Sequence, residues 1–177
     1  MRARYTRSLG LPVLEEETGD VLGVLSGMVL QPDTGVVEGF FVRMHGWSAN
    51  QQFLIAHDIL HWGTRITVRS SDVLSTVDDL VRVQSILAQK RPILGQTIVT
   101  ESGRTLGRCA DVQFATGSFC LEWLFPRRWF RWGVPIPASQ ILEVKPDAIV
   151  VKDPAATEEE REGGDEVTLI PPVPEAA

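Results

Sequence analysis

The segment Glu17-Thr18-Gly19-Asp20-Val21-Leu22-Gly23 occurs a second time as Glu101-Ser102-Gly103-Arg104-Thr105-Leu106-Gly107. In both places a short apolar run leads into the polar turn, and a longer run rich in β-formers follows it. Glycine in the turn permits a positive φ, and glycine inside the next strand is typical of a bulge or a sharp bend. The repeat predicts two copies of a small, curling antiparallel sheet.

Further matches extend the repeat toward the C-terminus. Thr34-Gly35 matches Thr116-Gly117, and Ile59-Leu60 matches Ile141-Leu142, at a spacing two residues shorter than that of the first turns. We therefore expect a two-residue deletion in the second copy between Gly107 and Thr116. Short strands at regular turn spacing are typical of small all-β barrels.

The segment between the copies has a different pattern. Leu80, Val83 and Leu87 are spaced to form one apolar face of a helix, and Pro92 would end it. The chain thus divides into a first barrel (residues 1–70), a linker with a short helix (71–91), a second barrel (92–152) and an acidic tail (153–177).

Composition and charge exclude several classes of protein. The chain has 177 residues, 44% of them hydrophobic and 23% charged, as in ordinary folded domains. It has two cysteines, too few for a disulfide scaffold, and no apolar run of about 18 residues that would span a membrane. Residues 1–7 are basic, but no apolar signal-peptide region follows. We expect a cytoplasmic location.

The net charge of −6 is unevenly distributed. Residues 153–177 contain eight acidic side chains and one basic side chain, whereas residues 90–152 contain nine basic and five acidic ones. The tail lacks apolar periodicity and is predicted to be disordered, with one short apolar patch at residues 167–170. It is interpreted as a solubilising tail, with a docking peptide or an autoinhibitory segment as the alternatives.

These motifs resemble the PRC-barrel family, which includes the cytoplasmic domain of the photosynthetic reaction-centre H subunit and the C-terminal domain of ribosome-maturation factors. The family pattern is an apolar strand, an acidic–Gly turn, an apolar–Gly strand, often an Asp, and then a second turn. Copy two contains that Asp as Asp111, whereas copy one has Gly27 in its place. The resemblance covers about residues 8–152. It implies two tandem PRC-type barrels and a non-catalytic adaptor.

The segment between residues 123 and 132 contains three Trp, two Phe and three Arg. Its C-terminal part supplies the candidate partner-binding residues, which are Arg127, Arg128, Trp129, Phe130, Arg131 and Trp132. Trp and Arg are enriched at binding hot spots, so a protein partner is the first hypothesis. RNA or a ribosome is the second, because Arg contacts phosphate and aromatic rings stack on bases. A membrane surface is the third. The alternative to all three is an intramolecular seam between the barrels.

Other chemistry-bearing residues give weaker patterns. His57 and His61 have a metal-binding spacing on a helix, but the segment reads as strand and turn, so no metal site is expected. Cys109 and Cys120 fall on neighbouring predicted strands, where they would be core residues or, alternatively, a redox pair. We find no phosphate-binding loop and no nucleophile motif. The sequence therefore predicts no enzyme and no cofactor.

Overall fold

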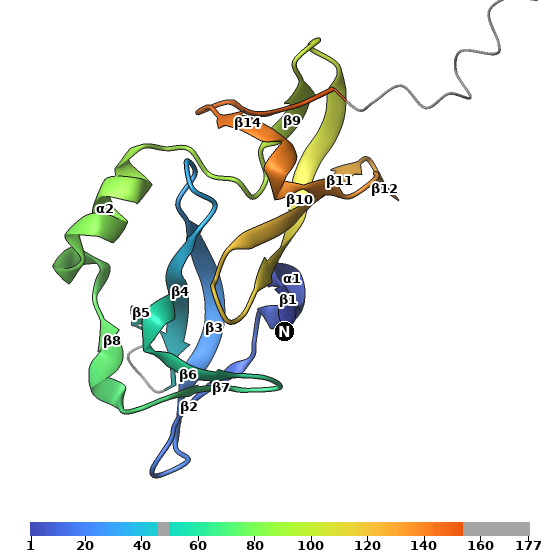
Figure 1. Cartoon of the computed structure of the whole chain (residues 1–177). Coiled ribbons are helices and arrows are strands. Elements are labelled where there is room, and N and C mark those ends of the chain that lie inside the picture. Colours follow the sequence, from blue (N-terminus) through green and yellow to red (C-terminus); the bar gives the residue numbers. More distant parts are fainter. Residues whose placement is uncertain (46–49, 154–177) are drawn as a thin grey trace, which may run out of the picture.

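The computed structural model describes residues 1–45 and 50–153, and within them the chain forms two curled β-sheets and two α-helices (Figure 1). The all-β prediction is therefore confirmed. The acidic tail, apart from Asp153, and most of the loop between residues 45 and 50 lie outside the described residues.

The first sheet has the strand order β6-β7-β2-β3-β4-β5-β8. Its strands are β2 (Pro12–Glu15), β3 (Val21–Leu30), β4 (Val37–Met44), β5 (Gln51–Ile55), β6 (Ile59–Trp62), β7 (Ile66–Val68) and β8 (Leu74–Ser75). A short 3-10 turn, η1 (Ala56–Asp58), joins β5 to β6. All neighbours are antiparallel except β2 and β7, which run parallel.

The second sheet has the order β12-β11-β10-β9-β15-β14, with β13 also paired to β11. Its strands are β9 (Thr97–Thr100), β10 (Thr105–Ala115), β11 (Leu121–Arg128), β12 (Arg131–Trp132), β13 (Ile136–Pro137), β14 (Ile141–Val144) and β15 (Ala148–Val151). The turn η4 (Ala138–Gln140) precedes β14. Again one pair, β9 and β15, is parallel.

The two sheets also share their pairing register. Met28 pairs with Phe40 in the first sheet, and Val112 pairs with Leu124 in the second, so both partners are shifted by 84 positions. A bulge interrupts β3 between Leu25 and Gly27, and the equivalent bulge interrupts β10 between Cys109 and Asp111. The bulge predicted from the strand glycines is confirmed for β3.

The second turn does not follow the predicted alignment. The amide of Gly35 donates to the carbonyl of Gln31, and in the second sheet the amide of Phe119 donates in the same way to Ala115. Phe119, with φ of 52°, is thus the counterpart of Gly35, and the prediction that chose Gly117 was wrong. The two-residue deletion falls after β11 instead, because β5 and β13 are shifted by only 82 positions.

A single hydrophobic core joins the two sheets. The rings of Phe40 and Phe114, one from each sheet, have centroids 5.8 Å apart, and Trp62 contacts Phe114 edge-to-face at 5.4 Å. Phe119 stacks on Phe114, which compensates for its strained backbone. Backbone hydrogen bonds also cross between the turns, from the Val37 amide to the Phe119 carbonyl at 2.7 Å.

The connecting segment packs on the first sheet. It contains η2 (Ser71–Val73), β8, η3 (Val77–Asp79) and α2 (Val81–Ala88), so the predicted helix is confirmed. Val83 and Ile86 are buried against Val29 of β3 and Phe53 of β5. Leu87, predicted to lie on the apolar face, is instead 45% exposed, because that face continues through residue 86.

The N-terminal residues cross to the other sheet. Strand β1 (Arg2–Arg4) pairs with β10, and the short helix α1 (Tyr5–Ser8) follows it. These residues, which the sequence analysis grouped with the first barrel, are therefore attached to the second sheet. The chain joins the first sheet just before β2, where the amide of Gly10 donates to the carbonyl of Leu25 in β3.

The shared core predicts one cooperative unfolding transition. Phe114→Ala should lower the free energy of unfolding by about 4 kcal/mol, because it removes a fully buried ring that contacts both sheets. Urea unfolding followed by far-UV circular dichroism and by Trp fluorescence should give coincident curves for the wild type. Two separated transitions would contradict a common core.

Candidate partner-binding hairpin

Strands β11 and β12 form a tight hairpin at the edge of the second sheet. Arg127 lies opposite Trp132 and Arg128 lies opposite Arg131, so only Trp129 and Phe130 make the turn. Trp129 has a φ of 56°, a conformation that a bulky residue adopts only under constraint. The amide of Gly133 donates to the carbonyl of Pro126 at 2.9 Å and holds the returning strand beside β11.

The aromatic side chains of the turn face solvent. Trp129 and Phe130 are each 86% exposed, and Trp132 is 56% exposed. The hairpin lies on the side of the molecule opposite α2, away from the junction of the two sheets (Figure 1). The intramolecular-seam interpretation of these residues is therefore wrong. The seam is made by Phe40, Trp62 and Phe114 instead.

Basic side chains surround the turn. Arg127, Arg128 and Arg131 are exposed, and Arg108 of β10 lies opposite Arg127. Across residues 1–45 and 50–153, none of these four arginines has a carboxylate oxygen within 4.0 Å. Within these ranges, no neighbouring carboxylate neutralises their charge.

The base of the hairpin is held by an arginine from the other end of the chain. The guanidinium carbon of Arg4 lies 3.6 Å from the ring centroid of Phe125 and 5.6 Å from that of Trp132. The guanidinium of Arg127 lies 5.6 Å from the same Trp132 ring. Cation–π contacts of this kind fix the orientation of Trp132 while leaving the turn beyond it exposed.

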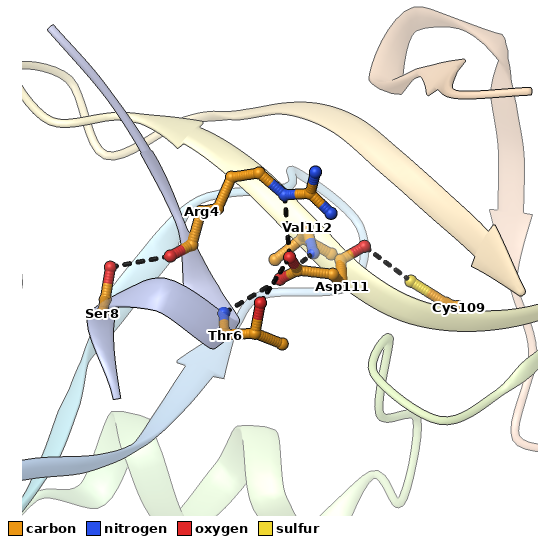
Figure 2. A network of polar contacts seen from close by, with 6 residues as sticks. All are labelled: Arg4, Thr6, Ser8, Cys109, Asp111 and Val112. Carbon is orange, nitrogen blue, oxygen red and sulfur yellow. Dashed lines mark hydrogen bonds and ion pairs between the residues drawn. The ribbon is translucent and has the colours of Figure 1, made fainter. Parts of the chain in front are cut away.

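Arg4 is itself positioned by a buried carboxylate, Asp111 (Figure 2). The Asp111 side chain is 1% exposed, and its Oδ2 accepts from Nε of Arg4 at 2.8 Å. Thr6 donates its backbone amide at 3.0 Å and its hydroxyl at 2.7 Å, and the amide of Val112 donates at 2.9 Å.

The first sheet has no equivalent of this network. Gly27 occupies the position of Asp111, and a Cβ added there would lie 2.9 Å from Cδ2 of Phe41. Phe41, the counterpart of Phe125, packs edge-to-face on Phe53 at 5.3 Å. The buried carboxylate is thus found in the second sheet and is replaced by a glycine in the first.

Sequence reasoning placed the six hairpin residues correctly as a group but missed Arg4 as their support. Its only signal was the basic character of residues 1–7, which says nothing about a contact with residue 111. Asp111 was noticeable as the one acidic residue of an apolar strand.

The histidines and cysteines that the sequence singled out lie as follows. His57 lies in η1 and His61 in β6, and the described residues contain no cluster of three groups able to hold a metal ion. Cys109 is buried and lies opposite Pro126 in the β10–β11 pair. Cys120 is exposed, and its backbone forms an isolated antiparallel β-bridge with that of Val36. Burial, aided by the nearby Asp111 charge, raises the pKa of the Cys109 thiol to about 12. The two thiols are free and do not form a pair in this structure.

The sequence matches no protein-family model and no curated protein. No helix among the described residues is long and apolar enough to cross a membrane. The hairpin geometry and its surroundings are therefore the basis for a functional assignment.

The buried carboxylate gives a stability prediction. Asp111→Ala should lower the free energy of unfolding by about 3 kcal/mol, because it removes several hydrogen bonds and leaves Arg4 without its partner. The matched control is Asp33→Ala, which removes a solvent-exposed carboxylate paired with Arg91. Urea unfolding should show little change for the control. Equal losses in both variants would contradict a special role for Asp111.

The exposure of the hairpin can be checked by acrylamide quenching of Trp fluorescence. Trp129→Phe/Trp132→Phe should reduce the strongly quenched part of the emission, because these rings are 86% and 56% exposed. The control Trp123→Phe replaces a half-buried ring on the same strand and should leave that part in place. Quenching that is unchanged in the double variant would place the two rings inside the protein.

Proposed function

We propose that this protein is a non-catalytic docking module of the adaptor type, acting in the cytoplasm, and that the hairpin β11–β12 is its binding surface. The matched strand order and register of the two sheets support their interpretation as tandem PRC-type barrels. No catalytic role is assigned to any residue.

One observation carries the proposal, namely the two aromatic side chains held in water at the tip of the hairpin. Burying a Trp or Phe side chain stabilises a complex by roughly 2 kcal/mol, so a ligand that covers both rings would be bound more tightly by the burial of each. The turn is also preorganised. Its base is fixed by Arg4 and Asp111, which reduces the entropy lost on binding.

A protein is the first candidate ligand, because Trp and Arg are the side chains most enriched at hot spots. RNA is the second, supported by the four arginines that lack carboxylate partners among the described residues. The dependence of the binding affinity on salt concentration distinguishes a protein ligand from RNA. The affinity for RNA should fall steeply with ionic strength, whereas an apolar protein contact should respond weakly.

The proposal is tested by placing a photo-crosslinking amino acid at position 130 in the full chain, expressed in its own cells. Phe130 projects from the tip, so light should attach the hairpin to whatever it binds, be it protein, nucleic acid or lipid. The control carries the same amino acid at position 60, where Leu60 is 46% exposed in the first sheet. Crosslinks at position 130 but not at 60 are expected. An absence of crosslinks at both positions would overturn the proposal.

A further inference from the structure

We infer that the ligand of the hairpin is the surface of a lipid bilayer with anionic headgroups, in which Trp129 and Phe130 insert while the flanking arginines contact lipid phosphates. This inference rests on the proposed function, because it takes the hairpin to be the binding surface. It goes further by naming the partner.

The order of side chains along the hairpin fits such an interface. The two aromatic residues are outermost, and Arg128 and Arg131 form the first cross-strand pair behind them. A strand rises about 3.3 Å per residue, so the backbone positions of these two arginines lie only a few ångströms behind those of the aromatic residues. Apolar side chains of interfacial segments enter a bilayer by about 5–10 Å, with basic residues level with the headgroups. The hairpin can therefore place its aromatic side chains in the acyl-chain region while its arginines lie level with the headgroups.

The charge around the turn is complementary to anionic lipid. Arg108 and Arg127 add a second basic layer behind the first, and no carboxylate in the described part of the chain neutralises any of the four. Each basic residue near an anionic membrane strengthens binding by about fivefold.

The two tip rings by themselves do not supply the area of an ordinary protein interface. Two aromatic side chains offer at most about 500 Å² between them, whereas a standard interface buries about 800 Å² on each partner. A bilayer requires no such matching surface, because its interior accepts an isolated apolar tip.

The hairpin is also poorly suited to stacking the bases of single-stranded nucleic acid. Proteins that bind single-stranded nucleic acid stack successive bases on aromatic platforms along a groove. Here the ring of Phe125 is covered by Arg4 at 3.6 Å, and Trp132 has two guanidiniums, those of Arg4 and Arg127, at 5.6 Å. Among the residues that the structure describes, no guanidinium covers the two tip rings, and these rings are adjacent residues of a tight turn.

The test is sedimentation of the full chain with vesicles of phosphatidylcholine alone or mixed with phosphatidylglycerol. We expect binding only to the mixed vesicles, a blue shift of the Trp emission, and quenching by lipids brominated on their acyl chains. Trp129→Ser/Phe130→Ser should weaken binding by about tenfold or more, since it removes the inserting side chains. Arg128→Gln/Arg131→Gln should weaken it by about twentyfold at physiological salt and less at high salt.

Matched controls lie elsewhere on the surface. Val81→Ser removes an apolar side chain of α2 that is 80% exposed, and Arg65→Gln/Arg69→Gln removes two exposed charges of the first sheet. Both should bind the mixed vesicles within about twofold of the wild type, since neither alters the hairpin. A loss in the controls equal to that in the hairpin variants would overturn the inference.

The outcomes separate this inference from the proposed function. If position 130 crosslinks in cells but the protein does not bind the mixed vesicles, the hairpin is a docking surface and the membrane inference is wrong. Binding of a uridine oligonucleotide that depends on Trp129 and Arg128, without vesicle binding, would identify RNA and would likewise overturn it. Vesicle binding without deep quenching of the Trp emission would show purely electrostatic adsorption and would overturn the insertion of the tip.

Discussion

A carboxylate that is buried in a protein core must be matched by donors, and in this protein the N-terminal segment supplies them to Asp111. Thr6 and Arg4 donate to it, and the strand β1 that carries Arg4 is thereby fixed against β10. Because Arg4 also lies over Phe125 and Trp132, the same carboxylate sets the base of the exposed hairpin. A buried ionic contact is a poor source of net stability, but it is effective at specifying one arrangement.

The two sheets show how one topology acquires two different surfaces. In the first sheet, Gly27 leaves room for Phe41, and the ring of Phe41 packs against that of Phe53. In the second sheet, Asp111 takes the place of the glycine and draws in Arg4, which stacks on Phe125. One exchange of glycine for a carboxylate thus goes together with the change from a packed aromatic ring to a supported one. The hairpin beyond that ring is held in place without being covered.

The position of the core at the junction between the sheets leaves the hairpin free of a packing role. Phe40, Trp62 and Phe114 form a common core where the sheets meet, so the hairpin at the far edge of the second sheet is not needed for packing. Trp129 and Phe130 stay exposed, whereas Phe40, Phe53 and Phe114 are fully buried. Whatever the hairpin binds therefore meets a surface that folding has already made rigid.

The sequence by itself determined the all-β class, the helix near residues 81–88 and the group of residues at the hairpin. These features are encoded locally, in turn glycines, in apolar periodicity and in the clustering of Trp with Arg. It misplaced the second turn, because Phe119 adopts there a backbone conformation that is normally marked by glycine. Whether the aromatic residues were exposed, and that Arg4 supports them, was decided only by the tertiary structure. The contact between Arg4 and Asp111 joins positions 107 residues apart, and a contact of that separation leaves no local pattern in a single sequence.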